Sequence, residues 1–207
     1  WAALRGGDPT AYHGGQVSLD PRAHIQREPF GMVVLPLISV VLSGWPFGFA
    51  SAPYNPRWAM HYPNRAAWMA LAGPAGNLTL VLAVVIAIRI GATAGFFIPP
   101  DAISFERVVA TSAGGVWPAI AFLLSVFFSL NLLLAVFNLI PVPPLDGSGA
   151  VPLLLSNEAT QRYQQFIWGQ PAFAWLGILV AWQLFDGLFQ PVWLLAVNLI
   201  HPNVWYG

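Results

Sequence analysis

Asp146 is the side chain in this sequence best placed for chemistry, because it follows a long apolar run that prolines interrupt. The run covers Trp117 to Ile140, and the stretch from Asn138 to Ser148 reads N-L-I-P-V-P-P-L-D-G-S. Prolines force extended backbone, which at membrane depth is tolerated only against protein or a wet cavity. An ionisable residue there is a candidate functional site by default. Asp-Gly is also a common turn pair, so local chemistry alone leaves a plain turn residue as an equal alternative.

Few other side chains could join Asp146 in a site. Asn138 offers the same cavity a hydrogen-bond donor and an acceptor. Asp186 is the only other acid within an apolar run, where it marks a helix break or caps a second half-helix. His24 could be a metal ligand, although a hydrogen-bonded structural histidine is the expected role. The other histidines are expected at surface or interfacial positions: His13, His61 and His201.

Composition indicates a membrane protein. Of 207 residues, 57% are hydrophobic and 8% are charged, whereas a soluble domain carries about 25% charged residues. Eight basic and eight acidic residues balance to zero net charge, so no basic excess suggests a nucleic-acid partner. With no cysteine, disulfides and cysteine-bound metals are excluded, and histidines and carboxylates remain as strong metal ligands.

Residues 66–90 and 117–140 are each long enough to cross a membrane as a helix, which takes about 20 residues. In the first, Ala72 and Gly76 form a small-xxx-small pair that allows another helix to approach closely. Asn77 lies one turn beyond Gly73 on the same face. Residues 149–170 are expected to form a surface helix. Residues 171–200 are apolar but contain Pro191 and an internal Asp-Gly, so they form one tilted span or two half-helices.

The N-terminal third is harder to assign. Residues 1–29 are polar and turn-rich, and the alternation in residues 16–19 predicts a small β-hairpin at the membrane surface. Residues 30–42 are apolar but short and contain Pro36, so re-entry into the membrane and a full crossing both stay open. Re-entry would place six of the eight arginines on one side, which the positive-inside rule favours. Residues 43–65 are expected to be a loop.

These patterns predict an all-α polytopic membrane protein forming a single domain over residues 1–207. It should have about three to four transmembrane helices, a re-entrant segment within 30–65 and the small N-terminal β-hairpin at the membrane surface.

The chain resembles the bacterial site-2 protease family of intramembrane zinc metallopeptidases. N-L-I-P-V-P-P-L-D-G, A-G-P-A-G-N at Ala72 to Asn77 and G-D-P-T-A at Gly7 to Ala11 carry the likeness, which extends over nearly the whole chain. The N-x-x-P-x-P-P-L-D-G signature is specific, and its position after G-P-x-x-N argues against chance.

The resemblance implies hydrolysis of peptide bonds within or near transmembrane segments of membrane proteins, with Zn²⁺ as cofactor. It makes Asp146 the third metal ligand. Asn138, Asn77 and Pro141 would belong to the substrate-binding cleft. The implied partners are transmembrane substrates and the lipid bilayer, and the implied location is the bacterial plasma membrane.

The sequence departs from the family in one respect. The family's H-E-x-x-H supplies two zinc ligands and the general-base glutamate, but none of the four histidines here belongs to one. We expect this motif immediately before Trp1, with W-A-A-L-R-G-G as the tail of its helix. The chain is then truncated and inactive by itself, and no catalytic residue is assigned within it.

Two other functions remain open at this point. One is a non-catalytic membrane scaffold or chaperone that binds transmembrane helices in the same cleft. The other is a small transporter with Asp146 and Asp186 on an ion path. For the protease, the Gln16 to Leu19 strand could hold an extended substrate by strand addition.

Overall fold

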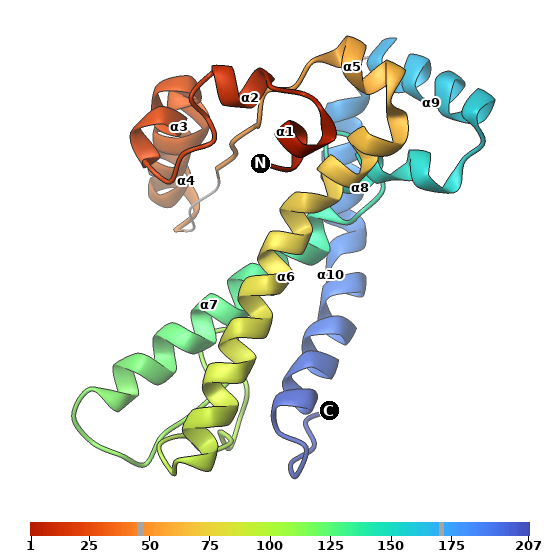
Figure 1. The fold of residues 1–207 in the computed structure, drawn as a ribbon. Helices are drawn as coiled ribbons and strands as arrows, with labels where there is room; N and C mark the ends of the chain where they lie inside the picture. Colours follow the sequence, from red (N-terminus) through yellow and green to blue (C-terminus); the bar gives the residue numbers. More distant parts are fainter. Residues whose placement is uncertain (45–47, 170–171) are drawn as a thin grey trace. The chain divides into compact units, whose positions relative to one another are not determined.

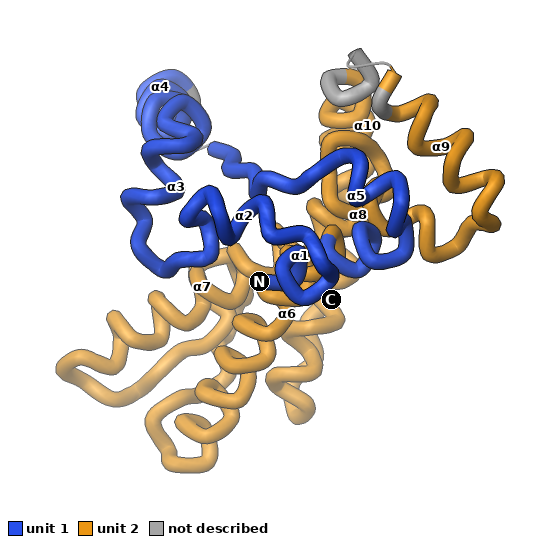
Figure 2. Tube along the Cα trace, turned by 45° about the horizontal axis from the view of Figure 1, so that its top comes forward, with its two compact units in different colours: residues 1–69 blue, residues 70–207 orange. Residues whose placement is uncertain are grey.

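The protein is helical throughout the computed structural model, which describes residues 1–44, 48–169 and 172–207 (Figure 1). Within those ranges no strand forms, and β-pairing is limited to two isolated bridges, Ile98 with Ala110 and Ser104 with Arg107. The predicted all-α class is therefore confirmed. The chain divides into two compact units, residues 1–69 and residues 70–207 (Figure 2).

Unit 1 is built from short helices, because turn-forming and capping residues recur throughout it. Gly7 ends the first helix with a left-handed φ of 100°, a conformation that glycine adopts at little cost. The helices are α1 (Ala2–Gly6), α2 (Thr10–His13), α3 (Pro21–Arg27), the π-helical η1 (Phe30–Val34), α4 (Leu35–Ser43) and α5 (Pro56–His61). Helix α6 (Pro63–Thr93) begins in unit 1 and continues into unit 2.

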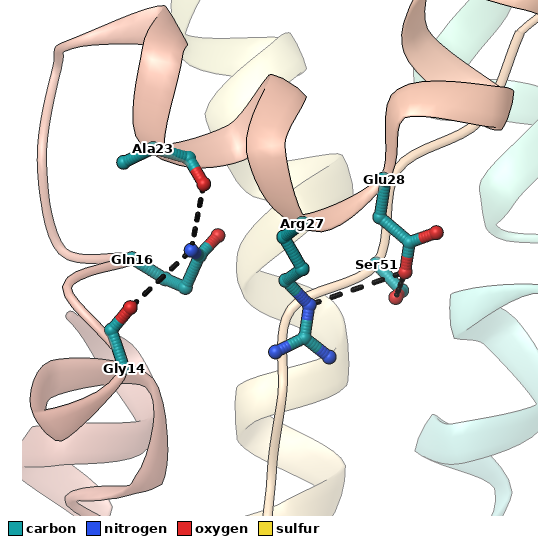
Figure 3. Close-up of polar contacts among 6 residues, drawn as sticks. All are labelled: Gly14, Gln16, Ala23, Arg27, Glu28 and Ser51. Atoms are coloured by element: carbon teal, nitrogen blue, oxygen red, sulfur yellow. Dashed lines mark hydrogen bonds and ion pairs between the residues drawn. The ribbon is translucent and has the colours of Figure 1, made fainter.

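The predicted N-terminal β-hairpin is wrong. Residues 16–19 form an irregular link between α2 and α3. The Gln16 side chain donates to the carbonyl oxygens of Gly14 (3.4 Å) and Ala23 (2.9 Å), so it joins two helices (Figure 3). Four alternating residues are too few to distinguish a strand from such a link, and with no strand here the strand-addition hypothesis loses its basis.

Helix capping explains the error. The Asp20 carboxylate accepts a hydrogen bond from the Arg22 amide (2.9 Å), and Pro21 occupies the first position of α3. Asp-Pro at this point is thus a helix start, with an N-cap followed by a proline that needs no amide partner.

The apolar segment 30–42 is helical throughout, as η1 and most of α4. Between α3 and this segment the axis bends by 108°. A broken span and a re-entrant loop both have this geometry, so the prediction of re-entry stays a prediction. Ser51 donates to the Glu28 carboxylate (2.6 Å), and Arg27 lies 3.9 Å from it (Figure 3).

The predicted loop 43–65 contains a helix, α5. The Asn55 side chain accepts from the Arg57 amide at 2.9 Å and the Trp58 amide at 3.4 Å, and Pro56 is the first helical residue. The Asn-Pro pair was the available signal for this helix. Residues 45–47 of the same predicted loop lie outside the described residues.

Asp8 is the polar centre of unit 1 and is only 1% exposed. Its carboxylate accepts from the Thr10 amide (3.0 Å), the Thr10 hydroxyl and the Asn55 amide (2.7 Å). Burial alone would raise the pKa of Asp8, but the three hydrogen bonds outweigh it and leave the pKa lowered. Nearby, Arg65 donates to the Gly6 carbonyl oxygen (3.3 Å) and thereby binds the end of α1.

Unit 2 contains the long helices. Three segments are long and apolar enough to cross a membrane: α6, α7 (Trp117–Asn138) and Leu176–Ile200 of α10 (Ala172–Ile200), and the bent α3 pair would make a fourth. The predicted spans 66–90 and 117–140 are confirmed. Helix α10 is one continuous helix with Pro191 inside it, although Pro171, where the prediction began, lies outside the described residues. The shorter helices are α8 (Asp146–Ala150), η2 (Val151–Leu154) and α9 (Asn157–Gly169).

One apolar core joins the long helices. Phe128 of α7, Ile88 of α6 and Val197 of α10 are fully buried in it. A polar contact also crosses between helices, because the Trp193 indole donates to the Ser129 hydroxyl at 3.1 Å. Such hydrogen bonds are a usual means of joining helices where water is absent.

His201 is a second correction. It was expected at the surface, but it is 6% exposed, and its Nε2 lies 2.8 Å from the Val108 carbonyl oxygen in the loop between α6 and α7. Arg89 donates to the Ile200 carbonyl oxygen, and Tyr206 donates its hydroxyl to the Pro100 carbonyl oxygen. The C-terminal residues therefore close the core against that loop.

Candidate functional site

The candidate site lies where α7 ends and the proline-rich stretch leads into α8. Helix α7 ends at Asn138, and successive backbone hydrogen bonds then hold a tight path: the Val142 amide to Ile140, and the Leu145 amide to Val142. Asp146 is the first residue of helix α8 and not, as expected, a residue of an isolated turn. An acidic side chain is favourable in the first turn of a helix, which explains the difference.

Close backbone approach fixes this path. A Cβ on Gly177 of α10 would lie 1.7 Å from the Pro143 carbonyl oxygen, and a Cβ on Gly147 would lie 2.3 Å from the Leu139 carbonyl oxygen. Only glycine fits at contacts this short. Leu145, buried with Ile140 and Ala181, anchors the same stretch through apolar contact.

Helix α8 is held in the same way. A Cβ on Gly149 would lie 2.8 Å from the Ala70 Cβ of α6. The Tyr163 hydroxyl of α9 donates to the Ser148 carbonyl oxygen (2.8 Å), and the Ser148 hydroxyl donates to the Leu145 carbonyl oxygen (2.8 Å). The residues on either side of Asp146 are thus anchored by α6, α9 and α10.

The Asp146 carboxylate lies against α6 at Gly73. A Cβ on Gly73 would be 2.7 Å from Asp146 Oδ2, so the absence of a side chain there makes room for the carboxylate. Across the described residues, Asp146 has neither a hydrogen-bond nor an ion-pair partner for its side chain. Burial raises the pKa of Asp146, since nothing nearby compensates for lost hydration. A half-buried carboxylate in this state has vacant acceptor capacity that suits a cation.

The structure brings the predicted site residues toward one region, but it does not test their roles. Asn77 is half-buried on α6, one helical turn beyond Gly73. Asn138 is half-buried at the end of α7, adjoining the Leu139 carbonyl against which Gly147 packs. Pro141 is exposed in the intervening stretch.

The weaker candidates do not join this site. His24 lies 2.9 Å from the Ser18 carbonyl oxygen through its Nε2, in keeping with a structural histidine. Asp186 is exposed on α10 and sits within a continuous helix, not at a break. In the part of the chain that the structure describes, no three His, Asp or Glu side chains come together as a metal-binding group.

Sequence reasoning missed the two glycines that position the carboxylate. It expected close approach at Ala72 and Gly76, yet a Cβ on Gly76 would meet nothing within 4 Å, and Gly73 is the position in contact. Gly177 was not singled out. A lone glycine inside an apolar helix is destabilising relative to alanine unless something packs on it, and that was the available signal.

Comparisons with known proteins agree with the residues that form this site. The family model described as Peptidase family M50 matches residues 10–178, which include the α7–α8 stretch. A relative from Bacillus subtilis, named "Putative zinc metalloprotease YwhC", is 30% identical over 93% of this chain and 85% of its own length. One from Mycobacterium tuberculosis, named "Putative zinc metalloprotease Rip2", is 33% identical over 78% of this chain. The matched part is 52% of Rip2, about half of that protein. No solved structure matches the chain.

The family match covers well over half of the 207 residues, and the YwhC relative covers nearly all of them. The chain is a membrane protein that belongs to peptidase family M50, the site-2 protease family.

Proposed function

We propose that the protein acts as an intramembrane zinc metalloprotease that hydrolyses peptide bonds within or near transmembrane segments of other membrane proteins. The proposed location is the bacterial plasma membrane. The observation that supports it most is the Asp146 carboxylate, which is half-buried, unpaired within the described chain and seated against Gly73.

The residues present fit one ligand of a zinc site. A carboxylate oxygen is a normal zinc ligand, and a rigid backbone position suits a metal that requires fixed geometry. The 207 residues contain no H-E-x-x-H, and no group of three potential ligands gathers among the described residues. In this proposal the other ligands and the general base come from residues that are not among these 207. A polypeptide of these residues alone is then inactive.

Bound zinc would supply an activated water by lowering the pKa of that water to about 7. The chain's own residues would do the positioning. Asp146 holds its carboxylate where Gly73 leaves room, and the backbone anchored by Gly177 keeps it there. The amides of Asn77 and Asn138 offer donors and acceptors to the backbone of an extended substrate, which needs such partners in a membrane.

The test is cleavage of a transmembrane reporter by the whole protein in lipid vesicles. Asp146→Asn keeps the size of the side chain but removes the charge, and we expect cleavage to fall by at least about 1000-fold, or about 4 kcal/mol. Asp101→Asn is the matched control, because Asp101 is an exposed acid in the α6–α7 loop, and it should leave cleavage unchanged. Wild-type cleavage by Asp146→Asn would disprove the proposal.

A non-catalytic scaffold for transmembrane helices is the second candidate. The lack of a three-ligand group among the described residues favours it. The same assay separates the two functions: a scaffold retains the reporter on the wild-type protein but releases no product, and Asp146→Asn leaves retention unchanged.

A further inference from the structure

The outer face of α10 carries a stripe of polar residues inside an apolar membrane span. Gln183, Asp186 and Gln190 are spaced three and four residues apart, so they lie on one helical face with Gly187 among them. Asp186 is close to the middle of the span Leu176–Ile200. We call these four residues the α10 stripe.

The α10 stripe is not the face that packs on the rest of unit 2. Phe189, Trp193 and Val197 of α10 enter the core, and Trp193 bonds to Ser129 of α7. All four stripe residues are exposed. None of the three polar side chains has a hydrogen-bond or ion-pair partner among the residues described.

This arrangement is unfavourable against lipid. Ionisable residues within membrane spans almost always face a protein interior or a wet cavity and pair with other groups. Glutamine amides likewise bond across helices when they lie in a span. A second polypeptide must therefore cover the α10 stripe in the membrane.

The stripe has the composition to pair with itself. Two glutamine amides supply donors and acceptors, and the carboxylate between them supplies acceptors. When two such helices pack side by side in parallel, each Asp186 falls between the partner's glutamines, one helical turn above and below. A Cβ on Gly187 would meet nothing within 4 Å, so a partner helix has room to approach closely there.

We propose that the α10 stripe is a homodimer interface, on which the α10 helix of a second copy of this chain packs in parallel. The interface is distinct from the Asp146 site and does not depend on proteolytic activity. A two-fold axis along the membrane normal satisfies it, because each copy then presents the same residues at the same depth.

Disulfide cross-linking tests this directly, since the 207 residues contain no cysteine. The whole protein, with any cysteine elsewhere replaced, carries Gly187→Cys and is oxidised in lipid vesicles. We expect most chains to become covalent dimers, with a yield that does not fall on tenfold dilution with lipid. Leu188→Cys is the control at almost the same depth but on another exposed face, and its yield should be at least fivefold lower.

A second variant tests which residues form the interface. Gln183→Leu with Asp186→Leu and Gln190→Leu, added to Gly187→Cys, should lower dimer yield at least fivefold while the protein still inserts in vesicles. Absence of dimers from Gly187→Cys, equal yields from both single cysteines, or an unchanged yield in the leucine variant would each overturn the proposal.

Discussion

Asp8 in unit 1 and Asp146 in unit 2 are both acids beside a helix start, yet their surroundings are opposite. Asp8 is fully buried and accepts three hydrogen bonds, whereas Asp146 is half-buried and has no partner among the described residues. The pKa of Asp8 is lowered and that of Asp146 is raised. A carboxylate satisfied by its own chain serves the fold, while one left unsatisfied has acceptor capacity for something the chain must bind.

The largest expected effect is on stability, from Asp8→Ala. It leaves the amides of Thr10 and Asn55 without their acceptor inside unit 1. The loss should be about 3 kcal/mol, because hydrogen bonds to charged groups are worth about 1.5–3 kcal/mol each and are not additive. Denaturant unfolding in detergent measures it. Asp146→Ala should change stability by less than about 1 kcal/mol in the absence of metal, and a larger loss there would erase the contrast.

Next in size is Gly177→Ala, which tests whether the backbone around Asp146 is held by close approach. The new Cβ would overlap the Pro143 carbonyl, so α10 or the proline-rich stretch must shift. We expect a loss of about 1–3 kcal/mol, read from thermal unfolding. Gly76→Ala is the control, because its Cβ meets open space. It should be neutral or stabilising by up to about 1 kcal/mol, and equal losses in the two variants would show that close packing is not the cause.

The pH dependence of stability should separate the two acids by sign. The lowered pKa of Asp8 contributes stability that is present above the unfolded-state pKa of about 3.9 and is lost as pH falls through the folded value. The raised pKa of Asp146 has the opposite sign, because it costs nothing below about pH 3.9 and destabilises as pH rises through its folded value.

Metal-free protein is therefore compared as Asp8→Asn and as Asp146→Asn over pH 3 to 7. Asp8→Asn should flatten the loss of stability in acid, and Asp146→Asn should remove a loss at higher pH. The same change in both profiles would contradict the assignment of opposite environments.

The smallest effect on stability, and the most specific one, is expected from Gly73→Ala. The new Cβ would press on Asp146 Oδ2, the end of a side chain that can move by a few tenths of an ångström. Stability should change by less than about 0.5 kcal/mol, but zinc affinity of the whole protein should fall about tenfold, as when a group that orients a metal ligand is lost. Unchanged affinity would show that Gly73 does not position the carboxylate.

Periodicity and length were enough to predict the helical class and the spans 66–90 and 117–140, because a membrane requires long uninterrupted apolar helices. They failed where local capping decides the structure. Asp20-Pro21 and Asn55-Pro56 each start a helix in stretches assigned to a hairpin and a loop. Buried His201 was missed because its partner, the Val108 carbonyl, is 93 residues away in the chain.

The candidate site shows the same division. Asp146 stood out because an acid after a proline-interrupted span is chemically unusual. Gly73 and Gly177 did not, because their role depends on contacts with Asp146 and Pro143 that only the folded chain creates. Spacing alone cannot say which of several small residues in a helix meets a neighbour.

Zinc content of the purified whole protein tests the central claim most directly. The wild type should carry one zinc per chain, and Asp146→Ala should bind zinc about 100-fold more weakly or worse. Asp101→Ala should match the wild type, since that acid is exposed outside the site. Equal zinc in the wild type and Asp146→Ala would contradict the assignment of this carboxylate to a metal.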